Sequence, residues 1–175
     1  MKTTGIVRRI DELGRVVIPK EIRKTMHIKE GEELEVFVEN EDTLVLKKYS
    51  AVASFKETGD AYVNILRKNL GYNCIICDND KCISASNDKE FYENKRITKS
   101  LENFLKQRKS MFFRGSEAFS IVIGADYKDM IIVPIIVNGD VIGGLILISK
   151  TLLSQAENIM KIMEISADFF AGQIE

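Results

Sequence analysis

The side chains best suited to chemistry in this sequence are basic ones near the N-terminus, interleaved with apolar residues. Residues 1–24 contain seven lysines and arginines and three acidic residues, whereas residues 25–50 contain three basic and seven acidic residues. The fifty-residue segment is therefore neutral as a whole but strongly polarised. Guanidinium and ammonium groups clustered in this way bind the phosphates of duplex DNA. The basic half predicts a phosphate-binding surface, while a charge run alone is also compatible with an ordinary solvated face.

Three cysteines, Cys74, Cys77 and Cys82, are the other residues with reactive potential. An odd number of cysteines in a chain without an export signal argues against a disulfide framework. Cys74 and Cys77 could form half of a zinc or redox site, but residues 72–78 have a strand pattern, in which positions three apart point to opposite faces. No second ligand pair follows, and the only histidine, His27, lies in a different segment. We therefore expect core cysteines and no metal site.

Several classes of protein are disfavoured by what the sequence lacks. It has one histidine, no GxSxG sequence, no glycine-rich phosphate loop and no convergent pair of carboxylates, so we expect neither an enzyme nor a cofactor. No apolar run approaches the roughly 20 residues needed to cross a bilayer. The first six residues lack the apolar region of a secretory signal. We expect a cytoplasmic protein with no membrane partner.

Short elements must position the basic side chains of residues 1–50. Strands are expected at residues 5–10, 15–18, 34–39 and 43–48, with a short helix at residues 20–26. Pro19 favours the start of that helix, and Gly14 favours a turn between the first two strands. A segment with about a dozen strong apolar residues cannot bury a sufficient core alone, and its strand edges need a partner. The sequence therefore predicts that two copies interleave.

Residues 51–175 have the pattern of a separate α+β domain with a mostly antiparallel sheet. Helices are expected at about residues 55–70, 97–106 and 152–174, and strands at residues 73–78, 81–85, 119–123, 129–137 and 140–149. Asn138-Gly139 predicts a hairpin turn between the last two strands. Gly143-Gly144 in the middle of a strand indicates a bulge or a close approach of two backbones.

The N-terminal residues resemble a known family. Residues 4–11 and 13–23, the latter reading LGRVVIPKEIR, are similar to the AbrB-type swapped-hairpin DNA-binding domain of bacterial transition-state regulators. The resemblance covers about residues 1–50 and implies that two chains interleave into one small all-β barrel with a short helix. It also implies that a basic surface of this dimer follows duplex DNA. The positions that match the family's DNA contacts are Arg8, Arg9, Arg15, Arg23 and Lys24, with Lys20 close by.

Residues 1–50 offer no helix as long as the recognition helix of a helix-turn-helix protein. Specificity would then come from a few arginines together with the shape and deformability of the DNA. We therefore expect tolerance of many sequences and a preference for A·T-rich promoters.

Residues 51–175 resemble a GAF-type sensor domain in the order of their elements. The resemblance to two-part regulators of spore-forming bacteria implies activation or repression of sporulation genes. It leaves open an unidentified small-molecule ligand, with residues 86–96 as a lid, or a role in dimerisation alone. The broad apolar stripe of the last helix favours packing against a second chain. Different pairings of the two domains would give a homotetramer. An antitoxin-like hairpin protein that binds a protein partner is the alternative function.

Overall fold

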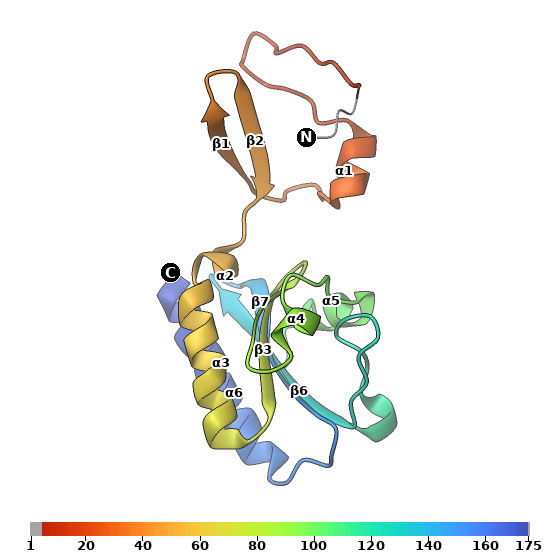
Figure 1. Ribbon diagram of the computed structural model, residues 1–175, viewed down its shortest axis with the longest axis vertical. Helices are drawn as coiled ribbons and strands as arrows, with labels where there is room; N and C mark the ends of the chain where they lie inside the picture. Colours follow the sequence, from red (N-terminus) through yellow and green to blue (C-terminus); the bar gives the residue numbers. More distant parts are fainter. Residues whose placement is uncertain (1–4, 175) are drawn as a thin grey trace. The chain divides into compact units, whose positions relative to one another are not determined.

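The computed structural model describes residues 5–174 of the chain. The chain divides into two compact units, unit 1 (Met1–Tyr49) and unit 2 (Ser50–Glu175), which Figure 1 shows in red to orange and in yellow to blue. Each unit has its own sheet.

Unit 1 contains one helix and one antiparallel hairpin. Helix α1 (Lys20–Met26) spans the predicted residues, and strands β1 (Leu34–Asn40) and β2 (Thr43–Lys48) pair antiparallel. Pro19 stands at the N-cap of α1, where its lack of an N–H group costs no helical hydrogen bond. The helix ends at His27, whose left-handed backbone (φ 56°) turns the chain toward β1.

The predicted strands at residues 5–10 and 15–18 are not formed in the single chain. Both segments have irregular backbone, and Figure 1 shows them as an open loop beside the β1–β2 hairpin. Their apolar side chains remain in solvent, with Val7 86%, Leu13 74% and Val17 73% exposed. A strand needs a hydrogen-bonded neighbour, and the described part of one chain supplies none here.

Unit 1 has almost no interior of its own. Pro19 is the only buried residue among residues 5–49. The hairpin also leaves apolar side chains exposed, including Val36, Val38 and Leu44. This agrees with the expectation that the segment cannot bury a core alone.

Unit 2 contains a five-stranded antiparallel sheet in the order β4-β3-β7-β6-β5. Its strands are β3 (Asn73–Asp78), β4 (Cys82–Ala85), β5 (Met111–Arg114), β6 (Asp129–Val137) and β7 (Asp140–Ser149). Its helices are α2 (Ala51–Ser54), α3 (Lys56–Leu70), α4 (Lys89–Tyr92), α5 (Lys99–Leu105) and α6 (Ala156–Ile174), with the 3₁₀ turn η1 (Gly115–Glu117) after β5.

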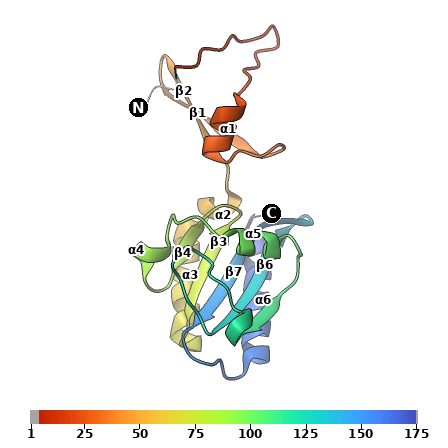
Figure 2. The same cartoon turned by 90° about the vertical axis from the view of Figure 1, so that its right-hand side faces the viewer.

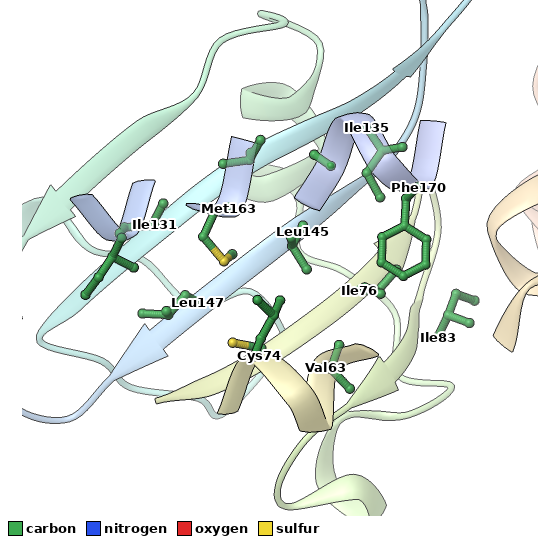
Figure 3. Packing of buried hydrophobic residues seen from close by; sticks show 14 of the residues in the cluster. Val63, Cys74, Ile76, Ile83, Ile131, Ile135, Leu145, Leu147, Met163 and Phe170 are labelled. Carbon is green, nitrogen blue, oxygen red and sulfur yellow. The ribbon is translucent and has the colours of Figure 1, made fainter. Parts of the chain in front are cut away.

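Two apolar layers cover the sheet of unit 2. Helices α3 and α6 lie against one face, while α4, α5 and the loop after η1 lie against the other (Figures 1 and 2). In Figure 3, Val63, Met163 and Phe170 point from the two long helices toward side chains of the sheet such as Leu145. Cys74 belongs to this layer and Cys77 to the opposite one, which confirms that the two cysteines face opposite sides of β3.

Gly143 and Gly144 allow β7 to lie close to its surroundings. A Cβ atom on Gly143 would stand 2.1 Å from the backbone oxygen of Cys77, and one on Gly144 would stand 2.8 Å from Leu105. The prediction of a close backbone approach at this pair is confirmed. The register of β6 and β7 also shifts nearby, between Ile135 and Ile136.

The structure of unit 2 differs from the sequence prediction at residues 119–123 and at β5. Residues 119–123 form no strand; their buried Ile121 and Val122 sit in a loop that Thr98 fixes by donating from its hydroxyl to the Ser120 carbonyl, 2.6 Å away. Strand β5 was not expected, because its four residues carry no alternation of apolar and polar side chains.

Candidate nucleic-acid interface

The open segment of unit 1 (residues 5–18) contains a tight turn, and this turn carries Arg15. The N–H group of Gly14 donates to the Asp11 carbonyl at 2.9 Å, and the Asp11 N–H donates to the Arg15 carbonyl at 3.1 Å. The Asp11 carboxylate closes the turn from inside, since Oδ1 accepts from the N–H groups of Leu13 (3.0 Å) and Arg15 (2.8 Å). Gly14 supplies the left-handed backbone (φ 74°) that such a turn requires.

The side chain of Arg15 is oriented by the same aspartate. Its Nε lies 2.8 Å from Asp11 Oδ2, while 71% of the arginine side chain stays accessible. The backbone N–H of Arg15 and then its guanidinium hold the pKa of the Asp11 carboxyl below its usual value. The turn thus presents a cation whose direction is set but whose guanidinium can still reach a phosphate.

Helix α1 presents the second group of basic side chains. Lys20, Arg23 and Lys24 are all exposed, whereas Ile18 and Ile22 are half-buried and Pro19 is buried. The helix is therefore fixed through its apolar side and offers its basic side to solvent. The backbone carbonyl of Arg23 accepts from Ile28 N–H at 2.8 Å, which secures the helix end.

All six basic residues expected at the interface are exposed. Three of them, Arg8, Arg9 and Arg15, lie on the open segment, and the other three lie on α1. Apart from Arg15, none of the six forms an ion pair with another residue in the range 5–174.

Two lysines of residues 25–50 make contacts inside unit 1. Lys48 Nζ contacts Glu32 at 3.0 Å and donates to the His27 carbonyl at 2.8 Å, which ties β2 to the end of α1. Lys47 lies over the ring of Phe37 across the hairpin, 4.6 Å from its centroid. The sequence alone did not predict these contacts. The two lysines entered only the count of charged residues, because their partners are set by the hairpin register.

Unit 2 has a cavity of about 600 Å³ lined by residues from α4 and from the loop before β6. The lining residues are Asp88, Phe91, Tyr92, Gly124, Ala125, Asp126, Tyr127, Lys128 and Lys150. Three of them belong to the segment expected to act as a lid. Lys56 Nζ at the start of α3 anchors the end of that segment, lying 2.9 Å from Glu93 and 3.1 Å from Asp60.

Burial raises the pKa of two phenols beside this cavity and of the three cysteines of the core. The Tyr127 hydroxyl donates to Tyr92 Oη at 3.4 Å, and burial raises the pKa of both phenols. Burial also raises the pKa of Cys74 and Cys82 to about 12 and raises that of Cys77. Thiols in this state are poor nucleophiles. Within residues 5–174 no group of three or more histidine, cysteine or acidic side chains is placed to hold a metal ion.

The fold and the site together define a two-part protein, in which a hairpin unit with exposed basic side chains is joined to a separately folded α+β unit. Residues 54–175 match the family model of the stage V sporulation protein T C-terminal region, a transcription factor. Residues 7–54 match the model of MazE, the antitoxin of antidote–toxin recognition. The chain therefore belongs to the stage V sporulation protein T family of transcription factors.

Individual relatives agree with this assignment. Stage V sporulation protein T of Bacillus subtilis is 42% identical over 179 aligned positions, which cover 100% of this chain and 99% of that protein. The transition state regulatory protein AbrB of the same organism is 52% identical over 60 positions, covering 34% of this chain and 62% of AbrB. These matches confirm the AbrB-type N-terminal domain.

Unit 2 has the GAF fold. The GAF domain of an Acinetobacter phosphoenolpyruvate-protein phosphotransferase superimposes with a TM-score of 0.60 at 15% identity, covering 73% of this chain and 84% of that domain. At this identity the likeness concerns the fold alone. In the described residues, no helix combines the length and the apolar character that crossing a membrane would require.

Proposed function

We propose that this chain regulates sporulation genes by binding duplex DNA through the basic side chains of an intertwined N-terminal dimer. The observation that carries the proposal is the combination found in unit 1. Its apolar side chains lie exposed along both the open segment and the hairpin, and its six basic side chains are also exposed. A second copy interleaved with the first would bury the apolar set, and the dimer would present the basic set twice.

The mode of DNA reading follows from the length of α1. Seven residues make a helix of about 10 Å, which is too short to lie along the major groove as a recognition helix. Contacts from the arginines and lysines then go largely to phosphates, which fix position without reading sequence. Preference among sites comes from how easily the DNA adopts the required shape. We therefore propose broad tolerance with a preference for A·T-rich promoters.

A tetramer is the proposed working form. Helices α3 and α6 pack on the sheet through one side and leave Ile65, Ile162, Ile165 and Phe169 exposed on the other. A second copy of unit 2 is the simplest cover for this apolar surface. If the two units pair with different partner chains, two N-terminal dimers are linked, and their weak DNA contacts gain avidity.

The experiment is fluorescence-anisotropy binding of the full-length protein to an A·T-rich and a G·C-rich duplex of equal length. The double variant Arg8→Gln/Arg23→Gln removes two exposed cations of the basic half. Lys47→Gln is the control from the acidic half. We expect the double variant to lose affinity for both duplexes, and the control to bind within about twofold of the wild type. Equal affinity of all three proteins would overturn the assigned surface.

An antitoxin-like function is the second candidate, because residues 7–54 match the MazE model. It would require unit 2 to engage a toxin. Against it, the match to stage V sporulation protein T covers the whole chain, and unit 2 is a folded domain with two buried layers. Co-purification of a small partner protein at one-to-one ratio, with no affinity for DNA, would favour the antitoxin function.

A further inference from the structure

A second strongly basic segment lies in unit 2. Residues 95–109 contain six lysines and arginines and a single acid, Glu102, whereas the remainder of residues 50–175 contains nine basic and fifteen acidic residues. The modest net charge of the whole chain therefore conceals a segment of +5. This segment includes helix α5 and the residues on either side of it.

The fold turns these six basic side chains outward. Helix α5 buries Leu101, Phe104 and Leu105 against the sheet, so its remaining side faces solvent. Lys95, Arg96, Lys99, Lys106, Arg108 and Lys109 are all exposed. Figure 2 shows α5 on the outside of the layer that covers the sheet opposite α3 and α6. The basic segment is thus a surface, which we call the α5 surface, and it lies away from the exposed apolar side of α3 and α6.

The single acid of the α5 surface aligns two of its lysines. Glu102 Oε2 lies 3.2 Å from Lys99 Nζ, and Oε1 lies 2.8 Å from Lys106 Nζ. Lys95, Arg96 and Lys109 form no ion pair with any residue in the range 5–174. Arg108 makes only a loose 3.5 Å contact with the exposed Asp140. Most of the positive charge of this surface is therefore uncompensated by the protein.

We propose that the α5 surface is a second DNA-contacting surface that binds phosphates of the same duplex held by unit 1. The inference rests on the proposed DNA-binding function. A protein partner fits the surface less well, because protein–protein interfaces are depleted in lysine and enriched in aromatic residues, and the phenylalanine of α5 is buried. Exposed lysines and arginines that outnumber their acidic partners are suited to phosphate contacts that carry no sequence information.

The test uses the full-length protein and a duplex longer than the unit 1 site. Anisotropy titrations across a salt series give the slope of log affinity against log salt, which changes by about 0.9 for each phosphate that the protein no longer neutralises. The variant is Arg96→Gln/Lys109→Gln, and the control is Lys128→Gln/Lys150→Gln, two exposed lysines that belong neither to the α5 surface nor to α3 or α6. Both remove two exposed charges from unit 2. A second variant, Lys95→Gln/Lys109→Gln, guards against a local folding effect at Arg96.

We expect both α5 variants to reduce the slope by about 2 per DNA-bound chain, with the melting temperature unchanged and the control retaining the wild-type slope. Slopes equal to that of the control would overturn the α5 surface while leaving the proposed function intact. Absence of DNA binding by the wild-type protein itself would overturn both. Weaker binding by the α5 variants only with shorter duplexes would also contradict the proposal, since a longer duplex is what reaches a second surface.

Discussion

At the scale of single residues, Asp11 both stabilises the turn and orients the exposed guanidinium of Arg15. The carboxylate accepts two backbone hydrogen bonds inside the turn and one from the guanidinium. Because the arginine stays largely exposed, it can exchange this partner for a phosphate without rearrangement of the backbone. The turn would then keep its shape when DNA binds.

Replacing Arg15 with alanine should therefore weaken DNA binding without disturbing the turn. The backbone N–H of residue 15 remains to bond Asp11, so the fold of the segment is retained. We expect similarly weakened binding to all duplex sequences and a salt slope smaller by about 1 for each phosphate that Arg15 neutralises. Binding measured across several duplexes checks this. An effect confined to one sequence would indicate base reading by Arg15, and an unchanged affinity would remove the turn from the interface.

The pKa of Asp11 offers a second prediction at this scale. Hydrogen bonds from Arg15 lower it in the folded protein, so the carboxylate stabilises the turn at pH values above the ordinary range near 4. This stabilisation is lost as the pH falls through the lowered pKa. NMR titration of the Asp11 carboxyl should show a pKa below that of an exposed aspartate. In Arg15→Ala the pKa of Asp11 should rise only part of the way to its ordinary value. The backbone hydrogen bond from residue 15, which is the largest cause of the lowering, is retained in that variant. A normal pKa in the wild type would contradict this turn geometry.

At the scale of elements, parts of the chain that are fixed by local sequence could be predicted, whereas parts that are fixed by contacts with distant residues could not. Helix α1 and the β6–β7 hairpin occur at the expected residues, because proline and Asn138-Gly139 fix their ends by local stereochemistry. Strand β5 and the loop at residues 119–123 depend on contacts with distant residues. The same holds for the cavity beside α4, whose lining comes from separate parts of the chain.

The close approach of β7 to β3 predicts a sharp difference between two glycines. In Gly143→Ala the new methyl group would overlap the Cys77 carbonyl oxygen, a backbone atom that cannot move without separating the strands. We expect a decrease of about 1–3 kcal/mol or more in the free energy of unfolding and a melting temperature lower by about 2–4 °C per kcal/mol. The matched control is Gly172→Ala, whose methyl group meets open space on α6.

Alanine at position 172 should leave stability unchanged or slightly raised, since glycine is unfavourable in helices. Thermal unfolding followed by circular dichroism compares the two variants under identical conditions. Equal melting temperatures for Gly143→Ala and the wild type would mean that the two strands lie farther apart than described.

At the scale of the whole molecule, the described residues of each unit include an exposed apolar surface that a second copy could cover. In unit 1 it is the open segment with the hairpin, and in unit 2 it is the outer side of α3 and α6. The basic residues of the interface were readable from the sequence because charge and family motif mark them. Their arrangement on one surface belongs to the proposed dimer, because it depends on a partner chain that the sequence of one chain does not place.

The apolar surface of unit 2 yields a prediction about assembly. Ile165, 69% exposed on α6, would face its counterpart in the proposed tetramer, so Ile165→Asp should place buried charges at that interface. We expect native mass spectrometry to show dimers where the wild type gives tetramers, and avidity for DNA to fall at least about tenfold. Ser116→Asp in η1 adds the same charge at an exposed residue outside both α6 and the α5 surface, and it should leave the tetramer intact. Tetramers of Ile165→Asp would exclude this surface from the assembly.

The most direct test of the central claim is the affinity of the full-length protein for an A·T-rich promoter-like duplex across a salt series. A dimer that contacts DNA mainly through phosphates should bind with a submicromolar dissociation constant at low salt. Its log affinity should fall steeply against log salt, with about 0.9 of slope for each phosphate contact. Absence of binding even at low salt would contradict the account and direct attention to a protein partner of unit 1.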